Sequence, residues 1–123
     1  MPFIDPTPEQ IKKLIASDYK GPIVMLNLLK FKPDGGKESY RTYQEKTGAL
    51  FLGKNIAGAV YQGDGLMPII GDEEWDEIAL YEYPSISAFI DMATNEEYQE
   101  IVKYRREALL DSRLYCTVPN SHM

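Results

Sequence analysis

The sequence is poor in the residues that disulfide, metal and haem sites require. Among its 123 residues there is one cysteine, Cys116, and one histidine, His122. A single cysteine excludes a disulfide within the chain, and nothing points to an oxidising compartment. Because the body of the chain has no histidine, we expect no catalytic histidine, no histidine-based metal site and no haem ligated by histidine. We therefore expect neither a metal nor a cofactor.

Positive charge and long apolar runs are also scarce. Thirteen Lys and Arg residues stand against nineteen Asp and Glu residues, which gives a formal net charge of −6. Nucleic acids and anionic membranes bind cationic surfaces, so neither is an expected partner. The longest apolar run, at 23–29, is far too short to span a bilayer, and the first residues lack the features of a signal peptide. By elimination, we expect a cytoplasmic protein.

Apolar periodicity and turn residues predict a regular series of helices and strands. A first helix begins at Thr7, where Thr7 and Gln10 form a capping box and Pro8 fits the first turn. Further helices are expected at 37–54, from Ser85 and from a second capping box at Thr94–Glu97, and strands at 23–29, 56–62, 75–83 and 112–118. The apolar segment 66–70 is a candidate continuation of the second strand. A chain of this length fits one domain, 1–123.

After the first helix, the predicted order is strand, helix, strand, strand, helix, strand. This βαββαβ order is that of an α+β, ferredoxin-like fold, in which helices cover one side of an antiparallel sheet. The first and third strands carry apolar residues on both faces, although one face of such a sheet lies open to water. Two sheets packed face to face would cover these residues, so we expect a homodimer that forms a dimeric α/β barrel.

Four short stretches resemble a known family. They are Met25–Phe31, Tyr81–Ser85, Glu97–Gln99 and Arg105–Leu114. In this order and spacing they are similar to the family catalogued as domain of unknown function thirteen-thirty, within the dimeric α/β-barrel superfamily. The resemblance covers residues 21–118, so 1–20 form an N-terminal helical extension and 119–123 a tail. It implies a ferredoxin-like fold and a dimer, but no particular reaction, because the family has no general assigned activity.

Asn27 is the most informative single residue of the first strand. It is the one polar residue among the apolar side chains of 23–29. A buried amide without hydrogen-bond partners costs about 1–3 kcal/mol, so Asn27 needs partners. A structural bond to a neighbouring loop, a bond to a bound ligand and a role in the dimer contact all remain open.

Aromatic residues and one arginine complete the candidate site. Four of the nine tyrosines fall on elements that should border the space between sheet and helices: Tyr43, Tyr61, Tyr81 and Tyr98. They indicate either an aromatic pocket for a small organic ligand or plain core and interface packing. Arg105 lies on the apolar stripe of the last helix. Its guanidinium either holds an anionic ligand or pairs with a carboxylate of the fold, for which the candidates are Glu82, Asp91 and Asp111.

These residues lead to one hypothesis and one alternative. If Asn27 and Tyr81 share the helix side of the sheet, then Asn27, Tyr43, Tyr81 and Arg105 can converge on one cleft. The protein would then be a small-molecule binder or a cofactor-independent enzyme, with a tyrosine or Asn27 on a carbonyl or phenol oxygen and Arg105 on a carboxylate. The sequence identifies no substrate and leaves open whether the protein is an enzyme. The alternative is a non-catalytic dimeric protein with a structural or stress-related role.

Overall fold

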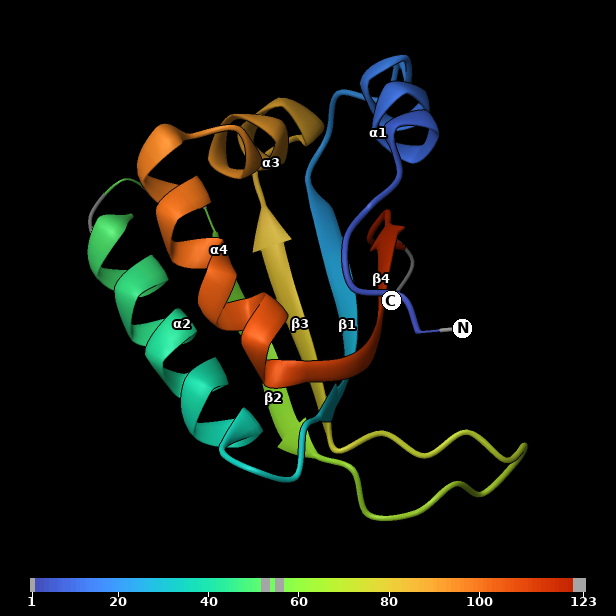
Figure 1. Ribbon diagram of the computed structural model, residues 1–123. Helices are drawn as coiled ribbons and strands as arrows, with labels where there is room; N and C mark the ends of the chain where they lie inside the picture. The colour runs from blue at the N-terminus through green and yellow to red at the C-terminus, as the bar shows by residue number, and fades with distance from the viewer. Residues whose placement is uncertain (1, 52–53, 55–56, 121–123) are drawn as a thin grey trace.

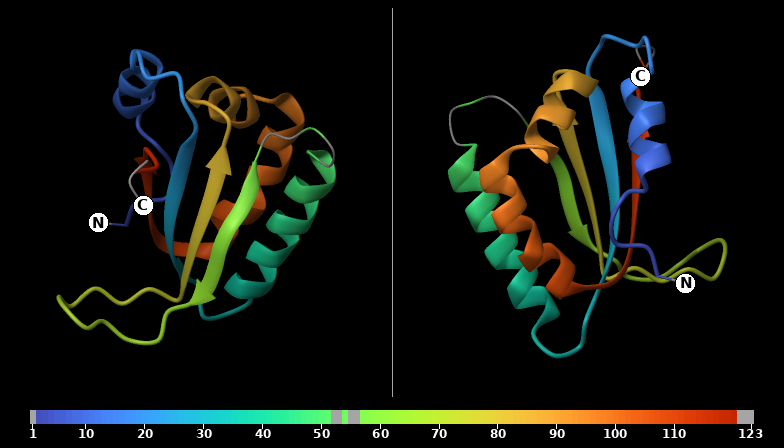
Figure 2. Two further views of the ribbon diagram at one scale, coloured as in Figure 1. Left: turned by 180° about the vertical axis from the view of Figure 1, so that it is seen from behind. Right: turned by 45° about the horizontal axis from the view of Figure 1, so that its top comes forward.

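A single antiparallel sheet with helices on one face forms the body of the computed structural model, which describes residues 2–51, 54 and 57–120. The elements in chain order are α1 (Pro8–Ile15), β1 (Ile23–Phe31), α2 (Gly36–Leu50), β2 (Gly58–Asp64), β3 (Glu77–Tyr83), α3 (Ile86–Ala93), α4 (Glu96–Ala108) and β4 (Leu109–Thr117). The strands lie in the order β2-β3-β1-β4, and each neighbouring pair is antiparallel. Helices α2 and α4 lie side by side over one face (Figure 1), and the other face is uncovered (Figure 2). The predicted α+β order is confirmed.

The caps confirm the predicted starts of α1 and α3, whereas α4 is capped by Asn95 and not by the predicted Thr94, which ends α3. Thr7 accepts a hydrogen bond from the amide of Gln10, and the Gln10 side chain accepts one from the amide of Thr7, both at 3.1 Å. Ser85 caps α3 and Asn95 caps α4, each through its side-chain oxygen. Such caps bind amide groups that would otherwise have no partner in the helix. None of the helices in the described part of the chain is long and apolar enough to cross a membrane.

The connection between β2 and β3 differs from the prediction. Residues 66–70 do not continue β2, and β3 begins at Glu77 rather than at residue 75. The reason is Asp76: its amide donates to the carbonyl of Leu29, its carbonyl accepts from Gly65, and its carboxylate accepts from the amide of Phe31. Asp76 thus closes an irregular loop onto the end of β1. The predicted strand start at residue 56 and His122 lie outside the described residues.

The core between helices and sheet is divided into two apolar clusters. One contains Ile23, Met25, Tyr83, Phe89, Met92, Tyr98 and Val102, and the other contains Leu29, Tyr40, Ala108 and Leu109. Along β1, Met25 belongs to the first cluster and Leu29 to the second, so Asn27 lies between them. Four polar or charged residues are buried among the described residues: Asn27, Glu77, Arg105 and Ser112. The layer between helices and sheet is therefore polar at its centre.

Candidate functional site

Asn27 and Tyr81 lie on the same face of the sheet. Asn27 is 8% exposed and alternates with the buried Met25 and Leu29, which places it on the helix side. Tyr81 pairs directly with Met25, and Ala79 pairs with Asn27, so the β3 residues at these positions share that face. The amide of Asn27 donates to the carbonyl of Met25 at 3.4 Å, which is a long hydrogen bond. Asn27 therefore points toward the helices, and not toward the uncovered face.

Tyr43 and Tyr98 connect the two helices above Asn27's face of the sheet. Their hydroxyl oxygens lie 2.7 Å apart, and their rings pack edge to face with centroids 6.1 Å apart. Burial raises the pKa of Tyr43 well above its ordinary value and also raises the pKa of Tyr98. Both side chains are consequently neutral phenols near neutral pH. They can donate a hydrogen bond to a bound oxygen or accept one from a ligand.

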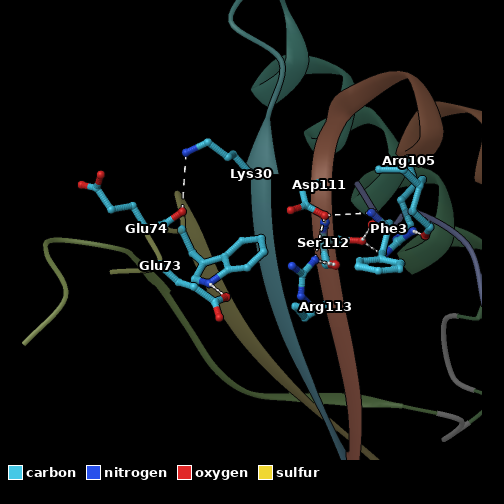
Figure 3. A network of polar contacts seen from close by, with 10 residues as sticks. Phe3, Lys30, Glu73, Glu74, Arg105, Asp111, Ser112 and Arg113 are labelled. Carbon is cyan, nitrogen blue, oxygen red and sulfur yellow. Dashed lines mark hydrogen bonds and ion pairs between the residues drawn. The ribbon is translucent and has the colours of Figure 1, made fainter. Parts of the chain in front are cut away.

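Arg105 is a buried cation whose partners are neutral. The residue is 9% exposed, its Nη1 donates to the carbonyl of Ile4 at 2.6 Å, and its Nη2 lies 3.5 Å from the hydroxyl of Ser112 (Figure 3). Among the described residues, no carboxylate lies within ion-pair distance of it. Its positive charge acts to lower the pKa of Tyr43 and Tyr98, against the larger effect of burial. The charge of Arg105 therefore acts on both phenols.

The predicted pairing of Arg105 with an internal carboxylate is not found in the described part of the chain. Asp111 immediately precedes Ser112 on β4, and successive strand side chains point to opposite faces. Its carboxylate accepts hydrogen bonds from the Phe3 amide, the Ser112 amide and the Arg113 side chain instead. The carbonyl of Ile4 takes the place of a counter-ion. A guanidinium has five N–H donors, so two contacts leave several donors for another partner.

A second polar group, which the sequence did not reveal, adjoins Tyr81 at the β2 side of the sheet. Glu77 is 1% exposed and receives hydrogen bonds from both terminal nitrogens of Arg41, at 2.5 and 3.3 Å. Gln62 also donates to Glu77, at 3.2 Å. Gln44 accepts from Arg41 and donates to the Tyr81 hydroxyl at 3.0 Å. Sequence alternation offered one signal, since Glu77 has the same parity as Ala79 and Tyr81 and so shares their face.

We call the combined set of side chains the polar belt: Asn27, Arg41, Tyr43, Gln44, Gln62, Glu77, Tyr81, Tyr98 and Arg105. All four residues predicted for the site belong to it. No hydrogen bond joins any two of those four among the described residues, and each is bonded to another partner. Two surface hollows lie elsewhere, one beside Trp75 and Arg113 and one between α1 and α3. Hydrogen bonds within the belt join Tyr43 to Tyr98 and connect Arg41, Gln44, Gln62, Glu77 and Tyr81, whereas Asn27 and Arg105 are bonded to residues outside it.

The belt offers hydrogen bonding and positive charge, but no nucleophile activated by a neighbour. Cys116 lies in β4, and burial raises the pKa of its thiol, which disfavours the reactive thiolate. In the described residues there is no group of three or more His, Cys, Asp or Glu side chains that could hold a metal ion. What the arrangement can do is bind and polarise an oxygen or an anionic group of a small molecule.

Comparison with solved structures finds a protein with substantial sequence identity to this chain. A protein of unknown function from Rhodopseudomonas palustris is 38% identical, with a TM-score of 0.89. The match covers 98% of this chain and 99% of that chain. No protein-family model matches the sequence, and no curated protein matches it.

Two further structures share the fold at low identity. A dimeric protein of unknown function from Bacteroides fragilis, with a ferredoxin-like fold, is 17% identical over 80% of this chain and 97% of that chain, with a TM-score of 0.57. A dabb family protein from Mesorhizobium loti, also with a ferredoxin-like fold, is 12% identical over 83% and 100%, with a TM-score of 0.59. At these identities the likeness concerns the fold alone. The predicted ferredoxin-like fold is confirmed.

Proposed function

We propose a function from the site itself for this chain, which belongs to the same family as the Rhodopseudomonas palustris protein of unknown function. The polar belt binds a small, partly apolar organic compound that carries an anionic group. The observation behind this proposal is Arg105. It is a 9% exposed cation with no carboxylate partner among the described residues. Buried charges are normally paired, because an isolated one is costly to remove from water. An anionic ligand would supply the missing charge.

The rest of the belt suits an aromatic compound. Tyr43 and Tyr98 present ring faces and neutral hydroxyls beside Arg105. Asn27, held by one long hydrogen bond, can turn its amide toward a carbonyl or phenol oxygen of the ligand. A bound ligand would displace the Tyr43–Tyr98 contact or the Arg105–Ile4 contact.

Any catalysis at this belt would be of a limited kind. Tyr43 and Tyr98 can donate a proton or a hydrogen bond to a developing negative charge on a bound oxygen, and Arg105 can hold a carboxylate in place. This fits the cofactor-independent enzyme or small-molecule binder predicted from the sequence. No reaction or substrate follows from it.

The alternative is a non-catalytic dimeric protein, structural or stress-related, and two contacts favour it. Arg105 already donates to the carbonyl of Ile4, and Glu77 is already paired with Arg41. In this case both residues serve only to attach the N-terminal segment and β3 to the helices.

We further infer that the protein is a homodimer whose uncovered sheet faces pack together. Half-buried apolar side chains line that face on the two central strands: Leu26 and Leu28 on β1, and Ile78 and Leu80 on β3. The Bacteroides fragilis protein of the same fold is dimeric. Membership of the thirteen-thirty family, a single domain and a cytoplasmic location complete the proposal, and each of these stays a prediction.

A thermal-shift screen tests the proposal for the belt. The panel consists of phenols, lactones and small aromatic acids, including salicylate and its neutral analogue salicylamide. A ligand that binds only the folded chain raises its melting temperature. We expect salicylate or another aromatic acid to raise the Tm more than its neutral analogue does. A panel in which no acid raises the Tm would contradict the proposal and favour the non-catalytic alternative.

A further inference from the structure

The connection between β2 and β3 is an exposed apolar arm. Residues 65–75, which we call the arm, form no helix or strand and extend away from the body in every view (Figures 1 and 2). The first half of the arm carries four large apolar side chains that are between 62% and 95% exposed: Leu66, Met67, Ile69 and Ile70. Apolar groups gathered on a surface in this way mark a contact with another molecule.

The base of the arm is firmly attached to the sheet. Gly65 donates to the carbonyl of Asp76 at 2.9 Å, and a Cβ at Gly65 would collide with the carbonyl oxygen of Trp75. The Trp75 ring in turn lies against the guanidinium of Arg113, 5.0 Å from the ring centroid. The arm therefore leaves the sheet in a fixed direction, and its exposure is a feature of the fold.

A second incomplete surface lies at α1. This helix has no buried residue, although Ile11, Leu14 and Ile15 form an apolar stripe, and Ile15 is 58% exposed. Beside it, between α1 and α3, is an open hollow of about 150 Å³ lined by Ile15, Ile86 and Ile90 together with Ser87 and Asp91. A hollow of that volume has room for a branched aliphatic side chain against its three isoleucines.

The arm and this hollow lie where a two-fold axis can bring them together. The arm and helix α1 both lie toward the β4 edge, at opposite ends of the sheet (Figures 1 and 2). An axis that runs between two face-to-face sheets and perpendicular to their strands exchanges the two ends, so it places each arm at the same end and edge as the other copy's α1. Charge agrees with this pairing. The arm ends in the acidic segment 72–74, and Lys12 and Lys13 are exposed in the last turn of α1.

We infer that the arm of one copy docks through Ile69 and Ile70 in the hollow between α1 and α3 of a second copy of this chain. The inference rests on the homodimer proposed above, and it adds a contact distinct from the packing of the sheets. By symmetry the contact occurs twice. Few residues of its own chain cover helix α1. In the dimer, this helix would form part of the binding surface for the partner's arm.

Cysteine cross-linking tests this contact in the full chain. In a Cys116→Ser background, Ile70→Cys is combined with Ile15→Cys, and each is also made alone as the matched control. Mild oxidation should convert the combined variant to a covalent dimer on a non-reducing gel, while the single variants remain largely uncross-linked. In parallel, the Ile69→Ser and Ile70→Ser double variant should raise the dimer dissociation constant about a hundredfold or more, measured by sedimentation equilibrium.

The outcomes separate this inference from the dimer itself. Cross-linking of the combined variant together with weaker dimerisation of the serine variant supports the arm contact. If the wild-type chain is a dimer but the combined variant does not cross-link and the serine variant dimerises as tightly, the arm inference is overturned and the dimer stands. A wild-type chain that is monomeric overturns both.

Discussion

The hydroxyl oxygens of Tyr43 on α2 and Tyr98 on α4 lie 2.7 Å apart, inside the layer between helices and sheet. This contact joins the two helices, and the charge of Arg105 acts to lower the pKa of both phenols. The same pair therefore contributes to stability and to the proposed ligand site. Variants of the polar belt have to be measured for both properties.

Removal of one hydroxyl from this pair should destabilise the fold. Tyr98→Phe leaves the Tyr43 hydroxyl buried without its partner, and we expect a loss of about 1–3 kcal/mol in the free energy of unfolding, measured by urea denaturation. Tyr115→Phe is the control, because Tyr115 is 71% exposed, and it should change stability by less than about 0.5 kcal/mol. Equal effects for the two variants would show that the Tyr43–Tyr98 bond does not stabilise the fold.

The Arg41–Glu77 pair should matter far more than a surface pair. Arg41→Met removes two hydrogen bonds from a carboxylate that is 1% exposed, and the loss of stability should be about 3 kcal/mol. Arg106→Met is the matched control, since its pair with Asp5 is about half exposed on both sides, and it should cost less than about 1 kcal/mol. Denaturation of both variants at one pH decides the comparison, and similar losses would contradict it.

Stability should fall at alkaline pH. Burial raises the pKa of Tyr40, Tyr43, Tyr83 and Tyr98 in the folded chain, whereas the unfolded value is about 10. Their contribution to stability is therefore fully present below about pH 10 and is lost as the pH rises toward the folded values. Tyrosinate absorbance during an alkaline titration should show these four ionising only as the chain unfolds. Ionisation of all four near pH 10 with the circular dichroism of the fold intact would refute this.

Ligand binding should depend on Asn27 and Arg105, whereas dimerisation should not depend on either residue. If salicylate binds, Arg105→Ala should weaken its affinity by about tenfold to a hundredfold, since a hydrogen bond to a charged group is lost, and Asn27→Ala should weaken it to a lesser degree. Arg113→Ala is the control, because Arg113 lies by Trp75 outside the belt. Titration calorimetry gives the affinities, and light scattering checks the dimer. Should both belt variants unfold or become monomeric, the two residues are structural.

Local signals in the sequence predicted the fold well. The capping box at Thr7 and the alternation along β1 depend on neighbouring residues, so they can be read without knowledge of the rest of the chain. The sequence did not determine the orientation of Asn27. One of the two faces of β1 had to meet the helices, but the alternation of residues does not show which one. Only the pairing with Ala79 and the position of α2 and α4 decide which one.

The partners of the charged residues could not be predicted, because they are distant in the sequence. Arg105 bonds to Ile4, which is 101 residues away, and Arg41 bonds to Glu77, which is 36 residues away. No periodicity connects such positions. The arm was misread for a different reason: segment 66–70 has a strand-like composition, but Asp76 closes the loop before it can pair.

The proposed anion site is tested most directly by mapping where an aromatic acid binds. We would titrate isotope-labelled chain with salicylate and record the NMR chemical shifts of the Arg105 guanidinium and of the Tyr43 and Tyr98 rings. The hollow beside Trp75 contains two cations, Lys30 and Arg113, together with the carboxylates of Asp72, Glu73, Glu74 and Asp111, and so serves as an internal comparison in which the positive charge is already balanced. The account predicts saturable shifts at Arg105, Tyr43 and Tyr98. Shifts confined to Lys30, Trp75 and Arg113, or no saturable shift at all, would contradict it.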